Sequence, residues 1–326
     1  MSRTAEVAAE RHALVRSVSR TVVTAIQAIW GDVPPTRILS AMQGEAGRAI
    51  LSAVTAGQMT VVQGAEMFVS ASLMAQGAPA APLGRLLPEA LVGIASDARP
   101  LISLLYVPAI TTARALAVGE SEAVAALRGL NQMALLSGTQ IADTARAATS
   151  VAMAAHPRCI SYVRVVKLPA CARCILLAGR QYSYSTGFKR HPKCDCGMQP
   201  MTDEEWRGSD SPEDLIRQMS PEEQRKRLGE AGVKALANGA DLGQIVNSRR
   251  GMATAATGRG PLRVTTEGTT KRGIGGKALD SGFQKIPGQR YERARESRLM
   301  PETIFKLAGT NREHQLAMLR KHGYIT

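Results

Sequence analysis

The sequence predicts a mainly α-helical protein with a small α+β module, and two observations lead to this fold class. Apolar residues recur at steps of three and four through the first half of the chain, which is the spacing of one helix face. Hydrophobic residues make up 44% of the 326 residues but aromatic residues only 4%, and such aliphatic composition suits packing between helices. We expect an N-terminal helical bundle, then a zinc-knuckle β-hairpin with helices, and last a basic flexible C-terminal tail.

The helical bundle is expected over residues 1–157. A first helix should begin near Thr4, where an apolar stripe starts, and end at Gly31, before the pair Pro34 and Pro35. Shorter helices are then predicted from the same periodicity at 36–56, 58–75 and 88–98.

A long helix is predicted at 121–155, with a stripe made largely of small residues. Small side chains let neighbouring helix axes approach closely, so this helix should lie at a bundle or subunit interface. Met59, Met67 and Met74 recur at helical spacing, and we interpret them as core filling rather than as a partner-binding face.

The α+β module is expected over residues 158–246. The segment 160–167 alternates β-branched or aromatic residues with polar ones, as a strand does, and 179–185 looks like a second strand after a turn. Helices should follow, because Ser220 and Glu223 have the spacing of a capping box, as do Thr202 and Glu205.

Positive charge is concentrated at the end of the chain. The net charge is +14, and residues 246–326 hold 16 Lys or Arg against 6 Asp or Glu. A flexible basic strap is expected at 247–290 because large apolar residues are few there, and a helical segment at 291–326. The charge predicts a polyanion partner. The candidate nucleic-acid contacts are Arg249, Arg250, Arg259, Arg263, Lys271, Arg272 and Lys277.

A cysteine cluster carries the clearest chemical signal. Cys171 and Cys174 form a C-x2-C pair, whose tight turn can aim two sulfurs at one point. His191, Cys194 and Cys196 follow across the predicted hairpin. Five candidates compete for the four positions of a structural Zn²⁺, and we favour the four cysteines with His191 beside them.

Two alternatives to that ligand set stay open at this point. A set with His191 and only one of Cys194 and Cys196 is also consistent with the spacing, and the cysteines can instead be buried thiols. A secreted disulfide scaffold is disfavoured, because five cysteines is an odd number and the first ten residues hold no apolar signal core. Cys159 should be a core thiol, and the interrupted apolar run at 101–110 is too short to span a membrane.

The motifs CARC and HPKCDC, the Gly179 turn and the segment that starts at SPEDLIRQ resemble the MuF-like head morphogenesis proteins of tailed bacteriophages. The N-terminal helices and ASDARPLISLLYVPAI look like minor capsid proteins of actinobacterial phages. The resemblance covers about residues 1–250, and its specific part is 160–250. It implies a virion component inside the capsid, present in the host cytoplasm during assembly, that associates with the portal protein.

We therefore expect a structural or assembly protein of a phage head, and not an enzyme. Its partners would be the portal, scaffold or major capsid protein, and phage DNA through the basic tail. Two alternatives are a capsid maturation protease and a zinc-containing DNA-binding protein or nuclease with His191 as base. Neither an HExxH nor a Gly-x-Ser-x-Gly motif is present. The glycines before Lys277 lack the spacing of a phosphate-binding loop.

Overall fold

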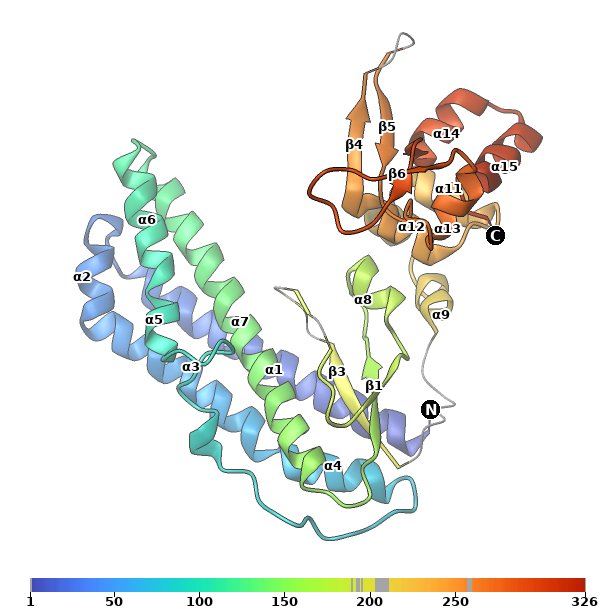
Figure 1. The fold of residues 1–326 in the computed structure, drawn as a ribbon. Coiled ribbons are helices and arrows are strands. Elements are labelled where there is room, and N and C mark those ends of the chain that lie inside the picture. The colour runs from blue at the N-terminus through green and yellow to red at the C-terminus, as the bar shows by residue number, and fades with distance from the viewer. Residues whose placement is uncertain are drawn as a thin grey trace. The chain divides into compact units, whose positions relative to one another are not determined.

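The computed structural model describes residues 2–188, 190–191, 194, 196–202, 211–256 and 260–325. The chain forms two compact units, one of residues 1–168 with 178–209 and the other of residues 169–177 with 210–326. Helices dominate and the sheets are small and antiparallel, so the predicted fold class is confirmed (Figure 1). The domain boundaries drawn from composition stay a prediction.

The first unit is built on long helices, and the two longest begin where the sequence places capping serines. Ser2 Oγ accepts the amide of Ala5 at 3.3 Å, and Ser121 Oγ accepts the amide of Val124 at 3.4 Å. The helices of this unit are α1 (Arg3–Gly31), α2 (Ile38–Gln43), α3 (Glu45–Gln63), α4 (Ala65–Met74), α5 (Leu101–Leu105), α6 (Val107–Ala117) and α7 (Glu122–Ala154).

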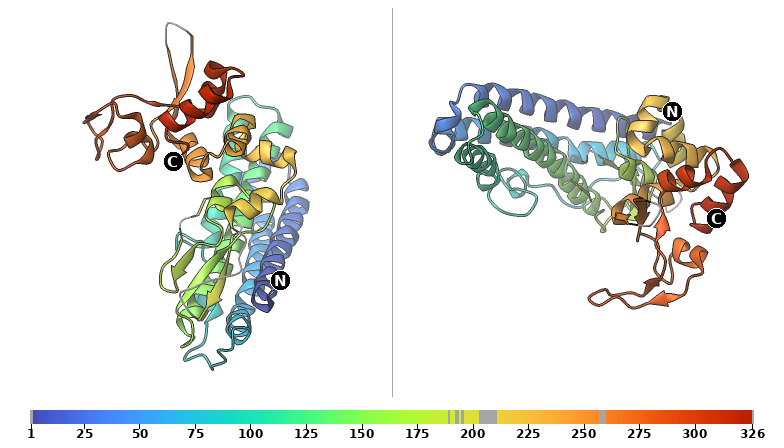
Figure 2. Two further views of the ribbon diagram at one scale, coloured as in Figure 1. Left: turned by 90° about the vertical axis from the view of Figure 1, so that its right-hand side faces the viewer. Right: turned by 90° about the horizontal axis from the view of Figure 1, so that it is seen from above.

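Helix α7 lies at the centre of this unit, and α1, α3, α4 and α6 pack against it (Figures 1 and 2). Ile26, Ile50, Met133 and Ile141 are fully buried in the core between these helices. Helix α3 packs closely against α1 and α7 at Gly57, where an added Cβ would lie 2.6 Å from Val22 and 2.8 Å from Ile141.

Two glycines of α7 provide a matched test of this packing. An added Cβ at Gly129 would overlap Thr112 Oγ1 and lie 2.6 Å from Trp30, whereas one at Gly138 meets nothing within 4 Å. We expect Gly129→Ala to lower the free energy of unfolding by about 1–3 kcal/mol through overpacking. Gly138→Ala should raise it by about 0.5–1 kcal/mol, because alanine is the better helix former.

Urea denaturation of both variants beside the unmodified chain measures the two changes. Because both substitutions add the same methyl group to the same helix, propensity contributes equally to each. Equal stability changes at the two positions would contradict the packing described for Gly129.

The sheet of the first unit has the strand order β2-β1-β3, and both pairs are antiparallel. Its strands are β1 (Ser161–Val165), β2 (Gln181–Ser183) and β3 (Gly197–Met201). The two strands expected from sequence are β1 and β2, and they pair with Tyr162 opposite Tyr182. Val165 of β1, the central strand, pairs with Gly197 of β3. Cys196 comes directly before Gly197, so it lies close to the end of β1.

Three local predictions for the helical part were wrong. The helix expected at 88–98 is only the 3₁₀ turn Pro88–Ala90, and Gly93 and Ala98 have φ of 80° and 68°, which ends any helical run. The segment 36–56 is broken at Gly44 rather than continuous. Met67 and Met74 are 73% and 61% exposed, so they do not fill the core.

The second unit combines short helices with short strands. Its helices are α8 (Ala172–Leu176), α9 (Pro212–Arg217), α10 (Pro221–Leu228), α11 (Glu230–Ala237), α12 (Leu242–Ser248), α13 (Ile274–Leu279), α14 (Pro301–Ala308) and α15 (Arg312–Lys321). Its strands are β4 (Met252–Ala255), β5 (Leu262–Thr265), β6 (Phe283–Gln284), β7 (Arg293–Ala294) and β8 (Arg298–Leu299). The predicted capping box at Ser220 and Glu223 is present. Thr202 is described, but Glu205 lies outside the described residues.

The segment 247–290, expected to be a flexible strap, contains regular elements in the structure. Strands β4 and β5 pair from Met252–Thr265 to Ala255–Leu262, and α13 lies beside the buried side chain of Arg298. An added Cβ would overlap Arg298 at Gly275 and Thr270 at Gly276. Gly275 permits close packing against an arginine and Gly276 against backbone, which low apolar content alone does not reveal.

Candidate metal centre

The five residues predicted as metal ligands come together in the structure as two overlapping groups. The ligand atoms of Cys171, Cys174 and His191 all lie within 4.8 Å of one another, and so do those of Cys174, Cys194 and Cys196. Tetrahedral zinc has bonds of roughly 2.3 Å to sulfur, which places its ligand atoms roughly 3.8 Å apart. The cluster can therefore bind a metal ion, and Cys174 belongs to both groups.

Local turns position the two halves of the cluster. Cys171 is the N-cap of α8, and its Sγ accepts the amide of Cys174 at 3.4 Å, which holds the Cys171 sulfur at the start of the helix. The amide of Cys194 donates to the carbonyl of His191 at 3.0 Å. Cys196 directly precedes β3.

The donor set fits a closed zinc site better than an open one. Thiolate and imidazole are the ligands that zinc prefers in structural sites, and Cys174, Cys194 and Cys196 are buried. Five candidates can fill four positions and leave none for a reactive water. Such a site would contribute folding free energy rather than Lewis-acid chemistry.

Two arginines, Arg164 and Arg146, support the Cys194 and Cys196 half of the cluster. Arg164, which is 2% exposed, places Nη2 at 3.6 Å from Cys194 Sγ and 3.5 Å from Cys196 Sγ. Its guanidinium also lies over the ring of Phe188, at 4.2 Å from the centroid. A buried cation beside two sulfurs stabilises negative charge on them, which metal ligation requires.

Arg146 of α7 holds the backbone of the same half. Its Nη1 donates to the carbonyl of Cys194 at 3.1 Å and to that of Cys196 at 2.9 Å. These two bonds hold both carbonyls against one helix. Sequence patterns gave no signal for this role, because Arg146 lies 48 and 50 residues from the carbonyls that it binds.

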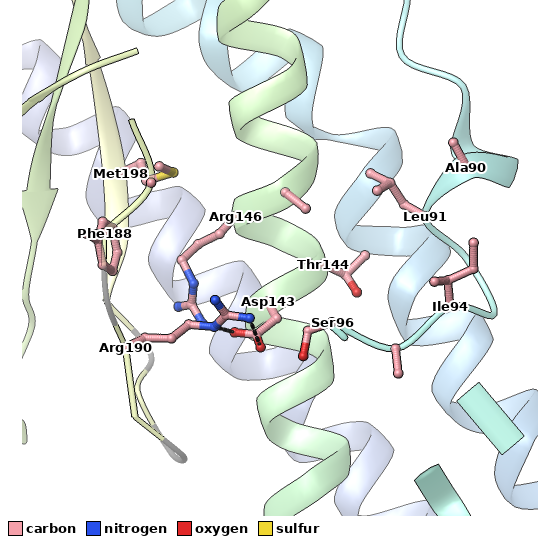
Figure 3. Close-up of a pocket in the computed structure, with 13 residues that line it drawn as sticks. Ala90, Leu91, Ile94, Ser96, Asp143, Thr144, Arg146, Phe188, Arg190 and Met198 are labelled. Atoms are coloured by element: carbon pink, nitrogen blue, oxygen red, sulfur yellow. Dashed lines mark hydrogen bonds and ion pairs between the residues drawn. The ribbon is translucent and has the colours of Figure 1, made fainter. Parts of the chain in front are cut away.

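Asp143 neutralises part of this positive charge. Its carboxylate accepts from Arg146 and takes two bonds from Arg190, each of 2.5 Å, from Nε to Oδ1 and from Nη2 to Oδ2. The Asp143 side chain is 4% exposed and that of Arg146 11%, so this is a buried ionic network. Figure 3 shows both guanidinium groups pointing at Asp143.

A cavity of about 280 Å³ opens beside this network (Figure 3). Phe188 and Met198 line one side, and Leu91 and Ile94 the other. Its only titratable lining residues among those described are Asp143, Arg146 and Arg190, which already bind one another.

Cys159, expected to be a core thiol, is 5% exposed and outside both groups. Its thiol donates to the carbonyl of Ser161 at 3.5 Å. Burial raises the pKa of Cys159 to about 11, so this thiol stays protonated at neutral pH.

The predicted nucleic-acid residues that the structure describes have different surroundings, and their role stays a prediction. Arg249 donates to the carbonyl of Leu228 and pairs with Glu302 at 3.3 Å, which is a structural role at the end of α10. Lys271 and Arg272 line a common pocket, which Arg250, Arg263 and Lys277 do not. Arg259 lies outside the described residues.

The fold and the cluster together define a helical protein with a small Cys/His metal-binding module. The chain belongs to the VG15 protein family, a family of phage-associated viral proteins, whose model matches residues 2–220. It is thus a phage protein, and its basic C-terminal part lies beyond the match. Searches of curated proteins and of solved structures found no match. None of the helices described is sufficiently long and apolar to cross a membrane.

Proposed function

We propose that this protein is a structural or assembly component of a phage head, that is, a minor capsid protein of the MuF-like type. The family match over residues 2–220 is the observation that carries the proposal. The resemblance of residues 160–250 to MuF-like proteins supports the finer assignment, and it implies association with the portal and a place inside the virion.

A structural Zn²⁺ is the second part of the proposal. The two groups that share Cys174 supply its ligands, and Arg164 offsets the negative charge of the thiolates. A bound metal would contribute folding free energy to the residues that ligate it.

Contact with packaged DNA is the third part. Residues 246–326 carry 16 bases and 6 acids, and all of this segment lies beyond the family match. Lys and Arg bind phosphate without regard to sequence, and this binding weakens with salt. The N-terminal helical part would then bind the portal or scaffold.

We propose that the protein acts without enzymatic activity. A filled metal site has no open coordination position, and the described cavity beside it holds no histidine or cysteine. Incubation with the major capsid protein should give no cleavage, and plasmid DNA should not be nicked. Nicking that disappears in His191→Ala would instead support a nuclease.

The decisive experiment is isolation of procapsids from infected cells, followed by cross-linking and mass spectrometry. We expect the protein in procapsids, cross-linked to the portal, with about one zinc per chain in the purified protein. Absence from procapsids would overturn the head assignment, whereas presence without zinc would overturn only the metal.

A further inference from the structure

The second unit contains a concave basic surface, and of the predicted nucleic-acid residues that the structure describes only Lys271 and Arg272 line it. Its cavity volume is about 720 Å³. The lining residues, called the basic pocket below, are Thr270, Lys271, Arg272, Lys285, Arg290, Tyr291 and Glu292.

Backbone pairing builds the pocket from two segments of chain. Strands β6 and β7 pair as an antiparallel hairpin whose loop is 285–292. Thr270 forms a bridge with Arg293, and the amide of Ala294 donates to the carbonyl of Thr269 at 2.8 Å. Residues 270–272 are therefore held beside the hairpin loop.

The loop itself is also tied down. The amide of Gln289 donates to the carbonyl of Ile286 at 3.1 Å, across a turn in which Gly288 has a φ of 77°. Lys285 Nζ donates to the carbonyl of Arg290 at 2.8 Å, which closes the loop on itself. The pocket thus has a defined shape before any ligand arrives, and this lowers the entropy that binding costs.

The pocket carries four cations and one carboxylate. Lys271 pairs with Glu292 at 3.5 Å, and both side chains are well exposed, at 70% and 47%. Arg272, Lys285 and Arg290 form no ion pair with any carboxylate among the residues described. A net charge of this sign in a concave surface concentrates field lines and favours a phosphate-bearing ligand.

Tyr291 adds a feature that a phosphate site alone would not need. The guanidinium of Arg290 lies 5.3 Å from its ring centroid, yet the residue remains 59% exposed. A large aromatic ring held in water among cations is the arrangement that binds unstacked bases, because the ring stacks on a base while the cations follow the backbone.

We propose that the basic pocket binds a single-stranded polynucleotide, with one base stacked on Tyr291 and the adjacent phosphates bound by Arg272, Lys285 and Arg290. The exposed ring favours a single strand over a duplex, whose bases are already stacked. This inference deepens the proposed contact with phage DNA, but it concerns a property of the isolated chain and can fail or succeed independently of the head assignment.

Fluorescence anisotropy of the full-length protein with a labelled 15-nucleotide oligo-dT, and with a 15-base-pair duplex, tests the proposal over a salt series. Tyr291→Ala should weaken oligo-dT binding by about 5- to 100-fold, the cost of losing one stacked base. Tyr291→Phe should keep the affinity within about 2-fold, because it keeps the ring. Duplex binding should change little in either variant.

Charge variants test the phosphate contacts separately. The plot of the logarithm of the binding constant against the logarithm of salt concentration has a negative slope. For oligo-dT, the double variant Arg272→Gln with Lys285→Gln should make this slope less steep by about 1.4, if each side chain contacts one phosphate. The matched control is Arg312→Gln with Arg320→Gln, two exposed arginines of α15 outside the pocket. It removes the same charge and should change the slope far less.

Three results would overturn the proposal. They are unchanged oligo-dT binding in Tyr291→Ala, an equal loss in duplex binding, and an equal effect of the control pair on α15. Far-ultraviolet circular dichroism of each variant confirms that the exposed substitutions leave the fold intact, so a loss of binding reports on the pocket itself.

Discussion

Substitution Cys174→Ser should reduce bound zinc from about one per chain to nearly none, and it should destabilise the protein by several kcal/mol. Cys174 is the member shared by both ligand groups, so its loss removes a ligand from whichever group binds the metal. Structural zinc contributes apparent binding free energies of about 10–16 kcal/mol in small zinc domains, and part of this is lost with one ligand. Metal analysis by mass spectrometry and thermal unfolding measure the two effects.

The matched control is Cys159→Ser, which makes the same chemical change at a buried cysteine outside the cluster. It should keep the zinc. Retention of one zinc per chain by Cys174→Ser would contradict the metal centre.

Two further variants separate the remaining ligand sets. His191→Ala keeps the metal if the four cysteines bind it, and loses it if His191 replaces a cysteine. Cys171→Ser gives zinc loss in both cases, and so shows that the assay responds to a ligand at that turn.

The long helices and the paired strands were predictable because their signals are local. The side-chain stripes that predicted α1 and α7 lie within the helices that they define. The alternation at 160–167 likewise predicted β1, and β2 follows it through a short connection. Strand β3 was missed for two reasons. Its residues, Gly197–Met201, pair with residues of β1 more than 30 positions earlier in the sequence, and they show no alternation of polar and apolar side chains.

Predictions failed where tertiary contacts decide the structure. The glycine-containing segment 247–290 has few apolar residues, but β4 and β5 satisfy each other's backbone groups and Gly275 accommodates Arg298. Arg298 itself donates to the carbonyls of Glu267, His322 and Gly323, which no sequence spacing connects. Composition predicts flexibility only when no such long-range partner exists.

Sequence likewise predicted one part of the candidate metal centre and missed another. The cysteines were found because metal ligands recur at characteristic spacing, whereas Arg146 and Arg164 were missed because their partners are backbone carbonyls and sulfurs distant in sequence. In the basic pocket, sequence clustering identified Lys271 and Arg272. Lys285 and Tyr291 reach them only through the pairing of β6 with β7.

Substitution Asp143→Asn should lower the free energy of unfolding by about 3–5 kcal/mol, the typical cost of leaving buried charge without its partner. The carboxylate receives bonds from both Arg146 and Arg190 while its side chain is only 4% exposed. Asparagine keeps the shape but directs an amide N–H₂ or a neutral oxygen at two guanidinium groups. Chemical denaturation with urea measures the loss.

The same substitution should reach the metal centre through Arg146, whose other nitrogen holds the carbonyls of Cys194 and Cys196. Zinc affinity, measured by competition with a chelator, should fall by about 10- to 100-fold, as it does when groups that orient metal ligands are lost. Asp97→Asn is the matched control, because Asp97 pairs with Arg99 at 2.8 Å while the two side chains are 53% and 45% exposed. It should cost less than about 1 kcal/mol and leave zinc affinity unchanged. If Asp143→Asn lowered the free energy of unfolding no more than this control, the buried network would not stabilise the fold. Arg146 would then hold the carbonyls of Cys194 and Cys196 without help from Asp143.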